Sequence, residues 1–143
     1  MKSNSWIIVA DQRHAKIFKL QKRAKLKPVR FFDSKEFEHF YTFTDKPGRS
    51  KKRRSLMVYT LDKNMRQKNT AEKHFFKSVL NFLDKEYQKK SFEHLYVIAE
   101  PKALGEIRKA TPAPLKTAIV KTKEKNLVKE DQMTVYEATE TMV

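Results

Sequence analysis

Two short, uninterrupted apolar runs constrain what this chain can fold into more than any other feature. WIIVA at residues 6–10 and LYVIA at residues 95–99 are each bounded by polar residues and rich in β-branched or aromatic side chains. A strand that is apolar at every position is buried on both faces, as in the middle of a sheet with helices on each side. The two runs therefore predict two central strands that lie far apart in the 143-residue sequence.

The first half of the chain predicts further strands. Residues 11–14 (DQRH) are polar and predict a turn, after which residues 15–20 return as a strand and complete a hairpin. A basic connector follows at residues 22–27. Aromatic side chains that favour strands then recur at 29–32 and at 37–43, on either side of a polar interruption.

A long helix is predicted in the middle of the chain. Residues 70–90 carry apolar side chains at the spacing of one buried helix face. This stripe consists of Phe75, Phe76, Val79, Leu80, Leu83 and Tyr87. Asn69, followed three residues later by Glu72, resembles a capping box, so we expect the helix to begin there.

The C-terminal third alternates strand with helix. Pro101 suits the first position of a helix over 102–109, which the TPAP sequence at 111–114 should end. A further strand is expected at 118–121 and a last helix at 130–139. We therefore expect one α/β domain over the whole chain, residues 1–143, built as a mixed β-sheet with packed helices.

Gly105 falls inside the helix expected at 102–109. Glycine in a helix interior costs about 1 kcal/mol relative to alanine. We therefore expect another backbone to pack closely against this position.

Three segments, taken in order, resemble a known family. They are residues 6–11 with 15–18, residues 45–50 (DKPGRS) and residues 95–108. Together they resemble bacterial proteins named for attachment to host cells, which are similar to the middle domain of the archaeal and eukaryotic peptide-release factors. The candidate family-motif positions are Asp11, Asp45, Gly48, Arg49, Pro101 and Gly105.

The resemblance implies a fold of the release-factor middle-domain or ribonuclease H-like kind, and a role in translation near ribosomes or tRNA. Release factors hydrolyse peptidyl-tRNA with a Gly-Gly-Gln loop. The glycines of this chain are Gly48 and Gly105, and neither is adjacent to a glutamine. Peptide release by that mechanism is therefore not expected.

Positive charge is concentrated in the first 68 residues, which hold 19 of the 32 Lys and Arg but 6 of the 17 Asp and Glu. The turn sequence DKPG at 45–48 opens a basic loop that we expect to be exposed around 46–56. Two clusters of cations stand out, and they are Lys22, Arg23, Lys25, Lys27 and Arg30, followed by Arg49, Lys51, Lys52, Arg53 and Arg54.

If the fold brings the two clusters to one side, they would displace counterions from a nucleic-acid backbone and bind it without base specificity. This interpretation favours RNA or the ribosome as the partner and also allows other polyanions. The competing interpretation is a merely solvated basic surface.

Aromatic side chains lie among these charges, and they are Phe31, Phe32, Phe37, Phe40, Tyr41, Phe43 and Tyr59. We expect most of them in the core, because phenylalanine is usually buried. Tyr41 and Phe43 are the expected exceptions, and exposed rings there could stack on unpaired bases.

Catalytic chemistry has less support in the sequence. Asp11 follows the first central strand, where a carboxylate could hold a divalent metal together with Asp45, Glu72 or Glu100; the alternative is a turn-capping role. The four histidines are scattered, and neither a nucleophile elbow nor a Walker or dinucleotide motif is present. We therefore expect no cofactor and, on balance, no enzyme.

The absence of cysteine fits a reducing compartment and a cysteine-free exported protein equally well. The N-terminal apolar run is too short for a signal-peptide core or a bilayer span, so we predict a cytoplasmic protein that is not an integral membrane protein. Three functions remain open. The first is a non-enzymatic nucleic-acid-binding domain. The second is a metal-dependent nuclease or hydrolase using Asp11, and the third is an interaction protein for host attachment, an acidic partner or an anionic membrane surface.

Overall fold

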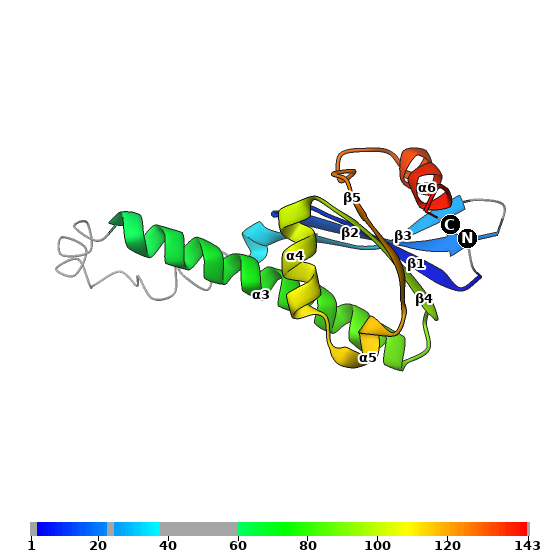
Figure 1. The fold of residues 1–143 in the computed structure, drawn as a ribbon, viewed down its shortest axis with the longest axis horizontal. Helices are drawn as coiled ribbons and strands as arrows, with labels where there is room; N and C mark the ends of the chain where they lie inside the picture. Colours follow the sequence, from blue (N-terminus) through cyan, green and yellow to red (C-terminus); the bar gives the residue numbers. More distant parts are fainter. Residues whose placement is uncertain (1–2, 23–24, 38–59, 143) are drawn as a thin grey trace.

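The computed structural model describes residues 3–22, 25–37 and 60–142, with side chains described for 3–22, 25–35 and 73–142. Within these ranges five strands form one sheet in the order β3-β2-β1-β4-β5 (Figure 1). The strands are β1 Ser5–Ala10, β2 His14–Gln21, β3 Lys25–Asp33, β4 His94–Ala99 and β5 Ile119–Glu124. The chain is thus an α/β fold with a mixed sheet, as the sequence predicts.

The sheet has an antiparallel part and a parallel part. β1 pairs with β2, and β2 with β3, in antiparallel hairpins, whereas β1 pairs with β4, and β4 with β5, in parallel. Parallel neighbours need long crossover connections, which helices supply here. These and the remaining helices are η1 Ser34–Phe37, α3 Thr60–Gln88, α4 Pro101–Ala110, α5 Ala113–Lys116 and α6 Gln132–Glu140.

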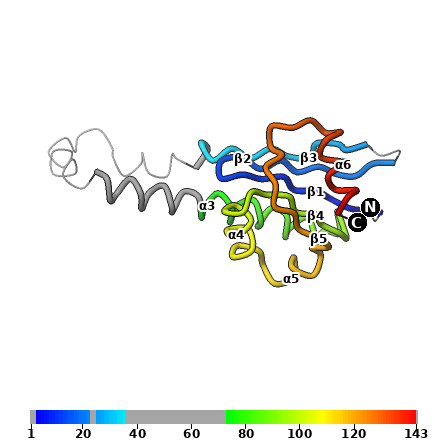
Figure 2. Tube along the Cα trace, turned by 45° about the horizontal axis from the view of Figure 1, so that its top comes forward, coloured from blue at the N-terminus to red at the C-terminus, as the bar shows by residue number. Residues whose placement is uncertain are grey.

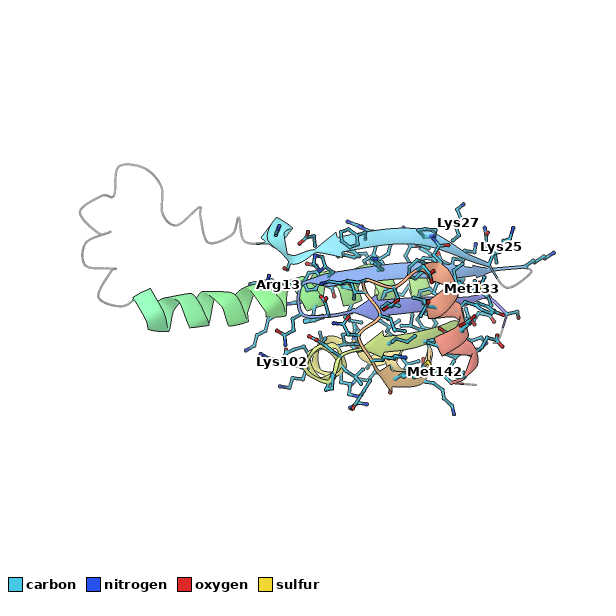
Figure 3. All side chains as sticks on the ribbon, turned by 90° about the horizontal axis from the view of Figure 1, so that it is seen from above. Arg13, Lys25, Lys27, Lys102, Met133 and Met142 are labelled. Atoms are coloured by element: carbon cyan, nitrogen blue, oxygen red, sulfur yellow. The ribbon has the colours of Figure 1, made fainter. Side chains whose placement is uncertain are left out.

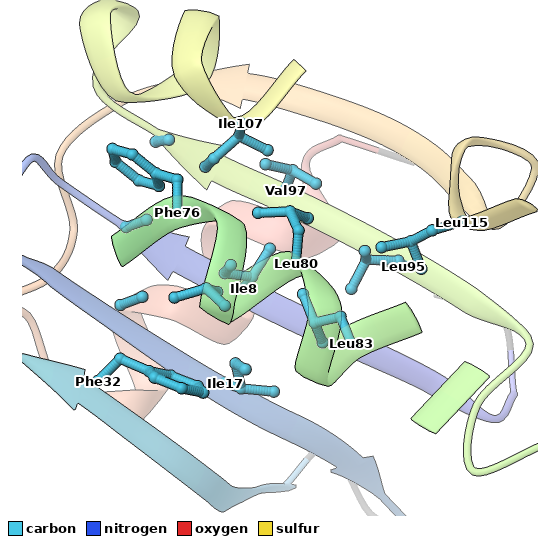
Figure 4. Close-up of a cluster of buried hydrophobic side chains, with 14 of the residues drawn as sticks. Ile8, Ile17, Phe32, Phe76, Leu80, Leu83, Leu95, Val97, Ile107 and Leu115 are labelled. Atoms are coloured by element: carbon cyan, nitrogen blue, oxygen red, sulfur yellow. The ribbon is translucent and has the colours of Figure 1, made fainter. Parts of the chain in front are cut away.

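Helices cover both faces of the sheet. Helices α3, α4 and α5 lie against one face and α6 against the other (Figures 1 and 2). On the first face Ile8, Ile17 and Val97 pack against the α3 stripe (Figure 4). On the second face Ile7, Val9, Tyr96 and Ile98 pack with Leu127, Val128 and Val135.

The two apolar runs are the two central strands. Every residue of β1 is buried, and β4 is buried from Leu95 to Ala99. Because alternate side chains point to opposite faces, a strand covered by helices on both sides must be apolar throughout. The prediction drawn from the runs is confirmed.

The start of the long helix was predicted wrongly. α3 is already helical at Thr60, so Asn69 lies inside it rather than capping it. The Asn69–Glu72 pattern caps a helix only where the preceding chain is non-helical, and here the helix continues upstream. In Figure 1 this upstream part extends past the end of the sheet.

β3 is longer than expected and absorbs much of the basic connector. It begins at Lys25, where Leu26 is buried and Lys25 and Lys27 are exposed, so the basic residues alternate with an apolar one. Phe37, expected in a strand, lies instead in η1. The rest of that expected strand, 38–43, lies outside the described residues, as does the basic loop around 46–56.

Helix α4 begins with Pro101 at its first turn and ends at Ala110, as predicted. The expectation for Gly105 is wrong. A Cβ built on Gly105 would meet nothing within 4 Å, so the residue is not required by a close backbone contact.

Candidate functional site

The β2–β3 hairpin places several cations on one face of the sheet. Lys19 lies opposite Lys27, Gln21 opposite Lys25, and Ile17 opposite Arg30, with a register shift between Ile17 and Phe18. Directly opposed residues of an antiparallel pair share a face. Since Ile17 belongs to the core on the α3 side and Leu26 to the core on the α6 side, Lys19, Lys25, Lys27 and Arg30 lie on the α3 side.

A groove of about 580 Å³ runs between β3 and α3. We call it the basic groove. Its lining consists of Arg30, Phe32, Ser78, Asn81, Phe82, Lys85, Glu86 and Lys89. The cations Lys19, Lys25 and Lys27 continue from it along the same sheet face towards the hairpin turn.

Arg30 is held against the wall of the basic groove by two rings. Its Cζ atom lies 4.5 Å from the ring centroid of Phe32 and 4.8 Å from that of Phe82. The two rings meet edge to face at 5.7 Å. A guanidinium over aromatic faces keeps its charge and its planar N–H donors while losing rotational freedom, so this cation is fixed in position.

Lys85 contributes from the last turn of α3, and Lys89 from the turn that directly follows this helix. Lys89 Nζ lies 3.8 Å from Glu86 Oε1, while Glu86 Oε2 accepts a hydrogen bond from Ser91 Oγ at 2.7 Å. The groove lining therefore combines three cations with one carboxylate. The sequence analysis missed both lysines because it considered only the cation clusters in the first half of the chain. The signal that could have identified them is their spacing, since Asn81, Lys85 and Lys89 follow one another at intervals of four residues, beside the apolar stripe of the helix.

The comparison with known families supports the predicted resemblance. A family model described as "Protein required for attachment to host cells" matches residues 6–138, which run from β1 into α6. The chain belongs to this family. No curated protein matches the sequence. The relation to release factors is not tested by the family match and stays a prediction.

The structure of this host-attachment family member describes only some of the cations that were predicted to bind nucleic acid. Lys25, Lys27 and Arg30 are exposed and share a face, and Lys22 lies in the turn after β2. Figure 3 shows Lys25 and Lys27 at the hairpin end of the sheet and Arg13 at the other end. Arg23 and the cluster at 49–54, together with Asp45 and Gly48, lie outside the described residues, so the meeting of the two clusters stays a prediction.

Asp11 has the turn-capping role. Its Oδ1 accepts hydrogen bonds from the backbone N–H groups of Arg13, at 2.7 Å, and His14, at 2.6 Å. Glu100 Oε1 accepts one from the backbone of Gln12 at 3.2 Å. Across the described side chains, which exclude Asp45 and Glu72, no three histidines or carboxylates gather closely enough to hold a metal ion.

The aromatic side chains divide differently from the prediction. Phe32 is buried in the core, as expected, but Phe31 is 51% exposed. By the β2–β3 register Phe31 lies on the α6 side of the edge strand, where it lines a hollow together with residues at the start of α6. Tyr41 and Phe43, the expected exceptions, lie outside the described residues, as do Phe40 and Tyr59.

Among the helices in the described ranges, none is both long enough and apolar enough to cross a bilayer.

Proposed function

We propose that this chain is a non-enzymatic binding domain whose basic groove holds the phosphate backbone of a nucleic acid, with RNA or the ribosome as the partner. One observation carries the proposal. Cations distant in the sequence, from β2, β3 and α3, come together along one side of the molecule, and the groove lining holds a single carboxylate. Such a cationic track displaces the counterions condensed on a polyanion.

The hairpin register adds an energetic argument. Lys19 and Lys27 lie directly opposite each other. Like charges at directly opposed positions destabilise a sheet, so the stability of the fold does not explain this pair. A polyanion lying along the hairpin would turn this repulsion into attraction.

The family description favours a second candidate. Attachment to host cells requires a surface that binds a host component, and the same cations would bind an anionic polymer there, such as a sulfated polysaccharide. The two candidates share one groove and differ in the polymer. Competition between RNA and a sulfated polysaccharide of equal charge concentration separates them, because the preferred polymer displaces the other.

The test compares two triple variants with the same change in charge. Lys27→Gln, Lys85→Gln and Lys89→Gln together remove cations along the groove, whereas Lys102→Gln, Lys109→Gln and Lys116→Gln remove exposed lysines of α4 and α5. Each lost phosphate contact lowers the slope of log K against log salt by about 0.7 for a single strand, so the groove variant should lose about 2. The α4–α5 variant should keep the wild-type slope.

Equal loss in both variants would mean that the overall charge, rather than the groove, attracts RNA, and would overturn the proposal. The same mixtures incubated with Mg²⁺ also report cleavage. Cleavage by the wild type that Asp11→Asn abolishes would support the metal-dependent hydrolase instead.

A further inference from the structure

A second hollow, of about 510 Å³, lies on the opposite side of β3 from the basic groove. We call it the α6-side hollow, because it is bounded by the β2–β3 hairpin and by the residues at the start of α6. Its lining consists of Lys16, Ile17, Phe18, Pro28, Val29, Arg30, Phe31, Glu130, Asp131 and Gln132. The hairpin side is largely apolar and the α6 side is acidic and polar.

Arg30 connects the two hollows, since it lines both of them. β3 is the last strand on its side of the described sheet. A flexible polymer can therefore cross the edge of β3 and contact the basic groove on one face and the α6-side hollow on the other. A rigid nucleic-acid double helix cannot bend sharply enough to contact both faces of the sheet at the edge of β3.

Phe31 presents an ordered aromatic surface in the α6-side hollow. The residue is 51% exposed, and its ring stacks on His14, with centroids 5.7 Å apart and an interplanar angle of 19°. His14 lies between two carboxylates, with Nδ1 3.6 Å from Asp11 Oδ1 and Nε2 3.7 Å from Asp33 Oδ2. The ring is therefore held in place before any ligand arrives, which lowers the entropy lost on binding.

We propose that the α6-side hollow binds one unpaired base of a single-stranded nucleic acid, stacked on Phe31, while Arg30 and its neighbours hold the adjoining phosphates. This inference rests on the proposed function and adds a second contact that only an unpaired strand can make, whereas a duplex contacts the basic groove alone. Every base has a flat face, so stacking on an exposed ring suits an unpaired strand of any sequence.

The carboxylate of Asp131, in the lining of the α6-side hollow, favours some bases over others. Asp131 Oδ1 accepts a hydrogen bond from the Thr134 backbone N–H at 2.8 Å, and this bond, with a further one from the Thr134 side chain, lowers the pKa of Asp131. An ionised carboxylate repels phosphate but accepts hydrogen bonds from exocyclic amino groups of bases. Cytosine, adenine and guanine carry such groups and uracil does not, so uracil should bind least well.

The first experiment uses Phe31→Trp as a probe. Trp6 is the one tryptophan of the chain and is 5% exposed, so its fluorescence should respond little to ligands. A short single-stranded oligonucleotide should quench the added indole at position 31 but leave the wild-type emission unchanged. A duplex of equal length should bind without quenching. Equal quenching by duplex and single strand would overturn the inference.

The second experiment measures affinity. Phe31→Ala should weaken single-strand binding about 5- to 150-fold, the range for losing one aromatic–base stack, and leave duplex binding unchanged. Met133→Ala is the matched control, because Met133 is 62% exposed on α6 and does not line the hollow. Replacing one cytosine by uracil in the oligonucleotide should weaken binding to the wild type but not to Phe31→Ala.

The outcomes separate the inference from the proposed function. If the groove variant loses affinity while Phe31→Ala keeps it, the base-binding inference fails and the proposed function stands. If the wild type binds neither single strands nor duplexes, both fail together.

Discussion

The central strands and the edge strand β3 differ in almost every physical respect. β1 contains no charged residue and is buried throughout, with helices packed over both of its faces. β3 carries three cations and one carboxylate, and Leu26 and Phe32 alone among its residues are buried. Both belong to one sheet, so the contrast reflects their positions in it.

This contrast in burial and charge separates residues that stabilise the fold, as in β1, from exposed residues of β3 that are available for binding. Exposed lysines, a proline and a bulge on an edge strand also prevent edge-to-edge pairing with another sheet, and β3 has all three. Edge protection, however, needs charges on β3 alone. Lys85 of α3 and Lys89, just after this helix, line the same groove, and edge protection does not explain them.

The largest expected effect tests the central strands. Ile8 is fully buried between β2, β4 and the α3 stripe. Ile8→Ala should lower the free energy of unfolding by about 2–5 kcal/mol, since it removes buried methylene groups and leaves a cavity. Val29→Ala, at an exposed position of β3, should cost under about 1 kcal/mol. Urea unfolding of both variants measures the difference, and similar losses would contradict the contrast.

The central strands could be predicted from the sequence because their burial is a local property of the pattern. Residues 6–10 of β1 and 95–99 of β4 are apolar at every position, and such a run is typical of a strand covered on both faces. The cap of α6 is also local, since Asp131 Oδ1 accepts a hydrogen bond from the Thr134 N–H, but the sequence analysis did not identify it. The Asp11 turn was likewise readable, because the side chain bonds the backbone two and three residues on.

The site could be predicted only in part, because it depends on which segments meet in space. Lys25, Lys27 and Arg30 stood out in the sequence, but Lys85 and Lys89 join them only through the packing of α3 beside β3. The exposure of Phe31 depends on how far α6 reaches across the sheet. No local pattern separates it from Phe32, its buried neighbour.

The second prediction concerns the layer that covers the parallel part of the sheet. Gly105→Ala should raise the free energy of unfolding by about 0.5–1 kcal/mol, because the glycine is helical and an added Cβ meets nothing within 4 Å. Thermal and urea unfolding measure the gain, and RNA affinity should not change. A loss of stability would mean that α4 packs more tightly than the structure indicates.

The smallest effect separates binding from folding within β3 itself. Lys27→Glu replaces a repulsive pair with Lys19 by an attractive one, worth about 0.2–1 kcal/mol in a cross-strand position. Unfolding at low salt should therefore become harder, and the gain should shrink as salt screens the pair. RNA affinity should fall in the same variant, because a cation beside the groove has become an anion.

Lys25→Glu provides the matched control, because Lys25 is exposed on the same strand and face but lies opposite Gln21. It should weaken RNA binding to a similar extent without the gain in stability. Equal stability changes in the two variants would show that the Lys19–Lys27 repulsion is negligible. If Lys27→Glu alone gains stability while both lose affinity, the lysine at position 27 opposes folding and favours binding, as expected of an edge strand used for recognition.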